Sequence, residues 1–149
     1  MRHLSIAVIF FLSVIGAVNA NPLGGDDLNF IGSSNFKRQF PQATEISYKV
    51  KGQFTEVNFM WDNMRLQAFY DIEGTLLATC RPVAINNLPV AAQLNLKDQY
   101  PNGIARDAIE YNDPNDGVSY YVTLVNQKNS YLLRVSTSGT ISVFKKMKN

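Results

Sequence analysis

Apolar and polar positions alternate through several stretches of the chain. Ile46, Tyr48 and Val50, for example, are separated by single polar residues. This period of two is typical of β-strands that bury one face. Turn residues at 51–52 and 62–63 break the pattern into hairpins. The expected strands cover residues 45–50, 54–61, 65–70, 75–83, 109–111, 118–125, 131–135 and 140–147.

Two other segments have a helical period. Leu88, Ala92, Leu96 and Tyr100 recur every four residues, which predicts a helix with one apolar stripe. A shorter helix is expected within residues 33–40, where two Phe residues lie one turn apart. A proline follows each helix and ends it. With about eight strands joined by hairpins, these helices predict an α+β fold in which both helices lie on one face of an antiparallel sheet.

Two short patterns occur twice, in the same order. Residues 36–41 match 96–101 as an apolar residue, three polar residues, an aromatic residue and proline, and residues 71–76 match 136–141 around a Gly-Thr turn. We interpret the matches as an internal duplication that gives tandem helix-plus-sheet repeats. The alternative is coincidence, since Gly-Thr is common in turns. The expected repeats are 33–83 and 87–147, within a single domain, 33–149.

The first 20 residues have the pattern of a secretory signal peptide. Arg2 and His3 precede an apolar stretch at 4–18, and small residues follow up to Ala20. We therefore expect cleavage after Ala20 and export of the remaining chain. The apolar stretch is shorter than the roughly 20 residues that a membrane-spanning helix needs. Residues 21–32, rich in Gly and Asp, are expected to form a mobile lead-in.

Composition narrows the compartment and the class of partner. Of the 149 residues, 46% are hydrophobic and 17% charged, which fits one folded domain. The net charge of +2 is too small to indicate a nucleic-acid-binding surface. Cys80 is the only cysteine, so an exported chain relies on its core, as in a bacterial periplasmic or secreted protein. No second apolar run could span a bilayer, so we expect no stable membrane insertion after signal cleavage.

The sequence offers few groups for catalysis or metal binding. His3 is the only histidine and leaves with the signal peptide, so the mature chain lacks an imidazole for a catalytic triad or a typical zinc site. Cys80 falls on an apolar strand pattern, which indicates a buried thiol. Acidic pairs such as Asp113 and Asp116 lie in turns, where Asp stabilises the local backbone. We therefore expect a protein that is not an enzyme and that binds no cofactor and no metal.

The strand alternation also predicts which residues share a face. The expected common core consists of Leu66, Ala68, Tyr70, Leu76 and Ala78 with Leu133, Val135, Ile141 and Val143, and with Tyr131 at its edge. The opposite face mixes large apolar side chains with arginines, a composition typical of interface hot spots. We take Phe69 and Phe144 as its anchors, although the lead-in could instead bury several of these residues. The expected partner-binding residues are Met60, Phe69, Leu77, Arg81, Tyr121, Leu132, Arg134 and Phe144.

Several motifs recur in the same order across residues 33–147. The first copy carries Phe40-Pro41, Ile46-x-Tyr48, Tyr70-Asp71-Ile72-Glu73-Gly74 and Leu88-Pro89. The second copy carries Tyr100-Pro101, Ile109-x-Tyr111, Tyr121-Val122-x-Leu124 and Ser138-Gly139-Thr140-Ile141. In this order the motifs resemble the PepSY-like, β-lactamase-inhibitor-protein-like (BLIP-like) small periplasmic proteins, although Val135-Ser136 replaces the Tyr-Asp pair in the second copy.

The resemblance implies one helix on a four-stranded sheet per copy and a non-catalytic binding or inhibitory role, and it carries over no functional residue. We therefore expect an exported module that engages an unidentified envelope protein or peptide through its open sheet face. The alternative is a carrier of a small apolar ligand held between helices and sheet, which would need a cavity.

Overall fold

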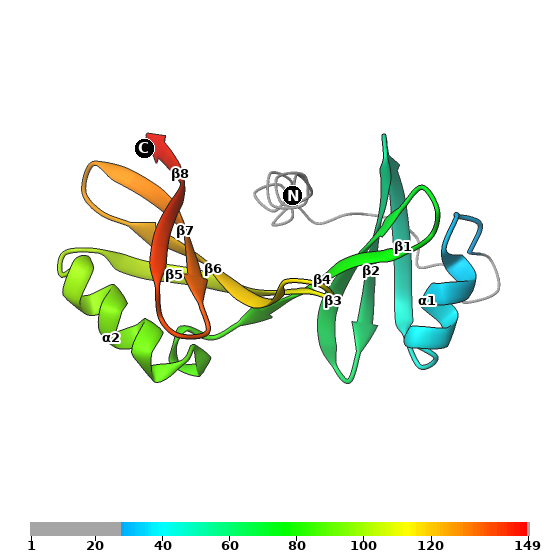
Figure 1. The fold of residues 1–149 in the computed structure, drawn as a ribbon, viewed down its shortest axis with the longest axis horizontal. Coiled ribbons are helices and arrows are strands. Elements are labelled where there is room, and N and C mark those ends of the chain that lie inside the picture. Colours follow the sequence, from blue (N-terminus) through cyan, green and yellow to red (C-terminus); the bar gives the residue numbers. More distant parts are fainter. Residues whose placement is uncertain (1–27, 149) are drawn as a thin grey trace. The chain divides into compact units, whose positions relative to one another are not determined.

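The computed structural model describes residues 28–148, which form eight β-strands and two α-helices (Figure 1). The expected strand positions are confirmed to within a few residues, except that the strand expected at 109–111 begins five residues earlier, at Ile104. Both α-helices end just before an aromatic-Pro pair, at Gln39 and Gln99. The elements follow in the order α1 (Ser33–Gln39), β1 (Thr44–Lys51), β2 (Phe54–Trp61), β3 (Met64–Asp71), β4 (Leu76–Val83), the 3-10 helix η3 (Ile85–Asn87), α2 (Val90–Gln99), β5 (Ile104–Asp113), β6 (Gly117–Val125), β7 (Asn129–Ser136) and β8 (Ile141–Lys148).

The expected α+β class with tandem helix-plus-sheet repeats is wrong. The eight described strands belong to one antiparallel sheet in the order β1 to β8, and the helices have only 7 and 10 residues, so the fold is mainly β. β4 pairs with β5 from Thr79↔Asn112 to Val83↔Ala108. The strand ladder therefore continues at the point where the first repeat was expected to end. The sequence pattern of a strand does not show which distant strand it pairs with, because the alternation of apolar and polar residues is the same whatever the partner.

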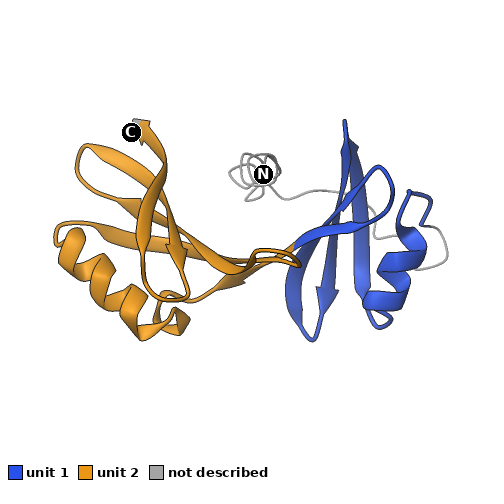
Figure 2. Cartoon of the chain, in the orientation of Figure 1, with its two compact units in different colours: residues 1–78 blue, residues 79–149 orange. Residues whose placement is uncertain are grey.

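The chain divides into two compact units, with the boundary between Ala78 and Thr79 (Figure 2). In the first unit, α1 packs on the sheet through Phe36, which is 1% exposed and lies edge-on to Phe59 with ring centroids 4.9 Å apart. Leu28 and Phe30 are buried in the same core. Residues 28–32, which we had placed in the lead-in, thus belong to the folded unit, while residues 21–27 and the expected signal peptide lie outside the described residues.

A glycine turn connects β3 to β4 beneath α1. The Asp71 carboxylate accepts hydrogen bonds from the backbone N–H of Glu73 and of Thr75, at 2.9 and 2.8 Å. Gly74 has a φ of 82°, and a Cβ there would lie 2.8 Å from the backbone of Gly32. The side-chain amide of Asn35 donates to the Gly74 carbonyl at 2.7 Å. Only glycine meets both the backbone conformation and the close approach.

In the second unit, α2 covers a core that includes Ala92, Leu96, Val122 and Leu133. The turn between β7 and β8 contains Gly139, with a φ of 88°. Its carbonyl accepts a hydrogen bond from the Asn95 side-chain amide at 2.9 Å. The same contact between a helix Asn and a turn Gly therefore occurs in each unit.

Most of the residues expected to share a core fall into two clusters, and Ala78, which is in neither, is fully buried. Leu66, Ala68 and Tyr70 are buried under α1 with Leu76 against them, and Leu133 and Val135 are buried under α2 with Ile141 against them. Tyr131 lies at the edge of the second cluster, as expected. Val143 was wrongly placed in the core, because it is 54% exposed on β8, whose pairing with β7 shifts register between Leu132 and Leu133.

Candidate binding faces

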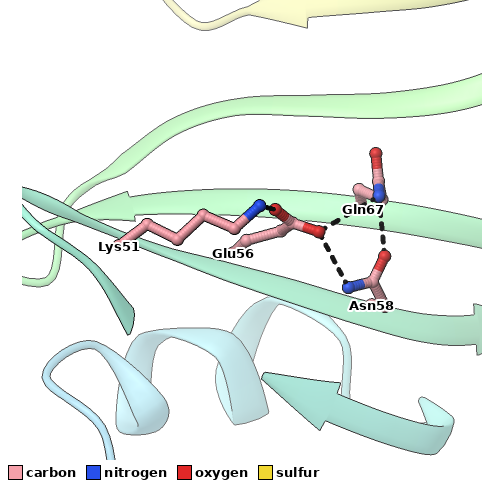
Figure 3. A network of polar contacts seen from close by, with 4 residues as sticks. All are labelled: Lys51, Glu56, Asn58 and Gln67. Atoms are coloured by element: carbon pink, nitrogen blue, oxygen red, sulfur yellow. Dashed lines mark hydrogen bonds and ion pairs between the residues drawn. The ribbon is translucent and has the colours of Figure 1, made fainter. Parts of the chain in front are cut away.

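A polar network lies on the sheet of the first unit, on the face away from α1. Val57 and Phe59 of β2 point into the core under α1, so Glu56 and Asn58 between them point the other way. Asn58 pairs with Gln67 across β2 and β3, and Glu56 lies near Lys51 of β1. Figure 3 shows these four side chains converging. We call Lys51, Glu56, Asn58 and Gln67 the polar network.

The Glu56 carboxylate is the centre of the polar network. One of its oxygens accepts hydrogen bonds from the side-chain amides of Asn58, at 3.1 Å, and Gln67, at 3.4 Å. The other forms an ion pair with the ammonium group of Lys51. Gln67 also donates to the Asn58 side-chain oxygen at 2.7 Å. Glu56 is only 6% exposed, so its charge is buried, and Lys51, Asn58 and Gln67 compensate it.

The second unit carries an aromatic row on the face away from α2. Val122 and Leu124 point into the core under α2, so Tyr121 points to the opposite side. The Tyr121 ring meets Tyr111 of β5 at 5.9 Å and Phe144 of β8 at 5.5 Å, both nearly perpendicular. We call Tyr111, Tyr121 and Phe144 the aromatic row. Edge-to-face contacts of this kind hold the rings in defined positions.

Two buried hydroxyl groups lie on this face without a hydrogen-bond partner in the described part of the chain: those of Ser119 and Tyr121. Both residues belong to β6, and they are 5% and 3% exposed. Arg134 of β7 is the direct cross-strand partner of Tyr121. Burial raises the pKa of Tyr121 above its ordinary value, and the nearby Arg134 guanidinium and the neighbouring Ser119 hydroxyl oppose that rise. The two hydroxyls thus lie near each other, but they make no hydrogen bond of normal geometry. The face thus combines rigid rings, a cation and unsatisfied polar groups.

Comparison with known proteins supports the fold. No family model matches the sequence, and no curated protein is significantly similar to it in sequence. A BLIP-like protein from Bacteroides fragilis superposes with a TM-score of 0.72 at 24% identity, covering 82% of this chain and 89% of that one. A DUF2874 family protein from Bacteroides uniformis gives a TM-score of 0.71 at 10% identity over 81% and 89%. The chain has a BLIP-like fold.

A third structure with this BLIP-like fold, from Bacteroides eggerthii, is described as that of candidate periplasmic proteins. It has a TM-score of 0.67 at 10% identity and covers 76% of this chain and 83% of that one. Among residues 28–148, no helix is both long and apolar enough to cross a membrane. The same residues contain no cluster of His, Cys, Asp or Glu that could hold a metal ion. The PepSY part of the resemblance remains a prediction.

The expected partner-binding residues differ widely in exposure within the BLIP-like fold. Phe69, Tyr121 and Leu132 are buried, at 2%, 3% and 5% exposed, whereas Leu77 is 38% exposed. Met60, Arg81, Arg134 and Phe144 are half-buried. The structure brings Tyr121, Arg134 and Phe144 together in the second unit. Phe69 is too buried to act as an exposed anchor.

The expected placement of Arg81 on the same face of the sheet as Tyr121 is wrong. Arg81 pairs with Glu110, and Glu110 pairs with Tyr120, which packs against the core under α2. Arg81 therefore lies on the opposite face from Tyr121, and its guanidinium binds the Glu110 carboxylate through two hydrogen bonds of 2.8 and 2.9 Å. Counting along β4 could not reveal this, because the β4–β5 pairing is not local in sequence.

The sequence reasoning missed the polar network as a unit. Alternation placed Gln67 away from the core, and the same count along β2 places Glu56 and Asn58 there too. No sequence signal shows that their side chains are buried and joined, because that depends on the register between β2 and β3 and on the position of Lys51.

Proposed function

We propose that this protein is a non-catalytic binding module of the bacterial envelope that holds another envelope protein or peptide on the aromatic row of its second unit. The observation that carries the proposal is the pair of buried, unsatisfied hydroxyls of Ser119 and Tyr121 beside Phe144 and Arg134. An unsatisfied buried polar group costs about 1–3 kcal/mol, which a partner that supplies hydrogen bonds would recover. Aromatic and Arg side chains are also the residues that dominate interface energies.

The polar groups of the chain support a binding rather than a catalytic role. The Glu56 carboxylate already has three partners, and the Cys80 thiol is 3% exposed. The only imidazole, that of His3, lies in the expected signal peptide. The leader pattern and the Bacteroides eggerthii structure support a periplasmic location. N-terminal sequencing of the exported protein should give Asn21 as the first residue, and material that still begins at Met1 would contradict the expected export.

The test is affinity capture from the envelope fraction of the source bacterium with three forms of the mature chain. Phe144→Ala removes the ring at the end of the aromatic row, and Val90→Ala, at a position 71% exposed on α2, is the matched control. Truncating an anchor costs about 2 kcal/mol or more, so the captured partner should bind Phe144→Ala about 30-fold more weakly. Equal capture by all three forms would refute the proposal. Phe69→Ala is unsuitable, because cutting back so buried a ring costs about 3–5 kcal/mol of folding stability.

A carrier of a small apolar ligand remains the second candidate, favoured by one feature. A hollow of about 270 Å³ lies at the end of α2, lined by Leu96, Tyr100, Ala105 and Leu124 among others. This volume is below the roughly 300–1,000 Å³ of most ligand pockets. Fluorescence of 1-anilinonaphthalene-8-sulfonate that rises with the wild-type protein and is lost with Ala105→Phe would support the carrier.

A further inference from the structure

Charge is distributed unevenly along the chain. Residues 117–149 contain five basic residues and no Asp or Glu, whereas all acidic residues occur at or before Asp116. This segment forms β6, β7 and β8, the strands that carry most of the aromatic row. β6, β7 and β8 therefore carry only positive charge from their own side chains, and Asp113 of β5 lies near Tyr111 at the other end of the aromatic row.

Arg134 is the cation that faces the aromatic row. It forms no ion pair with any residue that the structure describes, in contrast to Arg81, which binds Glu110. Lys145 pairs with Leu132 on the same face of β7 and β8, whereas Lys146 pairs with Tyr131 and lies 5.7 Å from the centre of its ring. The positive charge near Tyr121 is thus available for a negatively charged group.

The groups around Arg134 are hydrogen-bond donors that lack an acceptor. A guanidinium group has five N–H donors and no acceptor, and a hydroxyl can donate as well. Tyr121 lies directly opposite Arg134, and Ser119 lies two residues along β6 on the same face. A carboxylate accepts several hydrogen bonds at once and binds Arg through two of them. It is the group that satisfies this set of donors.

We infer that the partner presents an Asp or Glu side chain from an acidic segment to Arg134, with a neighbouring apolar side chain packed on Phe144. This inference rests on the proposed function and names the chemistry of the partner. The hydroxyls of Tyr121 and Ser119, on the same face of β6, supply further donors. The carboxylate replaces water around a half-buried cation, and the rings exclude solvent from the ion pair.

The experiment uses two fluorescein-labelled peptides and fluorescence anisotropy. In one peptide Glu alternates with Phe and Leu, and in the other Gln replaces every Glu. The wild-type chain should bind the Glu peptide about 10-fold more tightly or better, as a charge-assisted hydrogen bond predicts. Arg134→Gln should reduce binding of the Glu peptide to that of the Gln peptide. Lys146→Gln, which removes a charge on the other side of β8, should change it by less than about 2-fold.

Three results would overturn the inference: equal binding of the two peptides, no binding of either, or unchanged binding by Arg134→Gln. Circular dichroism must show that each variant is folded. If Arg134→Gln does not fold, Tyr121→Phe replaces it. This variant should bind the Glu peptide several-fold more weakly than the wild-type chain does and bind the Gln peptide with unchanged affinity. Vesicles of phosphatidylglycerol are tested as competitors. If they displace the Glu peptide from the wild-type chain and do not bind Arg134→Gln, the site binds a lipid surface and the inference is also refuted.

Failure of this inference can be told apart from failure of the proposed function. If the captured envelope partner is lost with Phe144→Ala but retained by Arg134→Gln, the aromatic row binds a partner and the acidic contact is wrong. If neither change affects capture, the proposed function fails as well.

Discussion

Replacing Tyr121 with Phe should make the free protein more stable. The change removes one hydroxyl oxygen and keeps the ring, so the contacts with Tyr111 and Phe144 remain. The hydroxyl is buried and has no hydrogen-bond partner among the described residues, whereas in the unfolded chain it would bind water. Folding therefore removes this hydroxyl from water without giving it a hydrogen bond in return.

The magnitude follows from that cost. An unsatisfied buried polar group costs about 1–3 kcal/mol, and part of this is recovered by van der Waals contact of the hydroxyl oxygen. We expect Tyr121→Phe to raise the free energy of unfolding by about 1 kcal/mol. For a domain of this size that corresponds to a rise in Tm of roughly 3–5 °C.

Tyr70→Phe is the matched control, because the Tyr70 hydroxyl donates to the Gln39 side-chain oxygen at 2.8 Å. Tyr70 is as buried as Tyr121, so losing this bond should lower the free energy of unfolding by about 1 kcal/mol. Urea unfolding followed by circular dichroism, with thermal unfolding beside it, measures both variants. If Tyr121→Phe destabilises the protein as much as Tyr70→Phe does, its hydroxyl has a partner and the reasoning about this face is wrong.

Three further predictions concern stability. Burial raises the pKa of three tyrosines: Tyr70, Tyr111 and Tyr121. The unfolded chain releases these protons near pH 10, whereas the folded chain keeps them, so the free energy of unfolding should fall as the pH rises above about 10. A urea midpoint that stays constant between about pH 9 and 11 would contradict this. Gly74→Ala places a Cβ 2.8 Å from the backbone of Gly32 and should lower the free energy of unfolding, measured in urea, by about 2–3 kcal/mol. Gly52→Ala is the control: nothing lies within 4 Å of its Cβ, and it should lower the free energy of unfolding by about 1 kcal/mol. Glu56→Ala removes the buried carboxylate that binds Lys51, Asn58 and Gln67, and it should lower the free energy of unfolding by about 2 kcal/mol or more. Glu45→Ala removes only an exposed ion pair with Arg65 and should lower it by less than about 0.5 kcal/mol. Similar losses for the two variants would show that the polar network is not buried.

Local features of the chain could be predicted from sequence because their causes are local. The alternation at Ile46, Tyr48 and Val50 reflects one-sided burial of a strand, and β1 covers these residues. Gln39 and Gln99 end the two α-helices because an aromatic-Pro pair follows each of them. Such features need only the residues within one or two turns of the chain.

The binding faces depend on contacts between distant segments, and the sequence does not encode these in any local pattern. The β4–β5 pairing turned Arg81 away from Tyr121 and joined the strands into one sheet, which changed the fold class. Phe69 looked like an exposed anchor from its place in the alternation, yet it is 2% exposed. Alternation tells which side of a strand a residue occupies, but what covers that side is set by register and packing. For this reason only the tertiary structure showed that the hydroxyl of Tyr121 is buried without a partner beside Arg134.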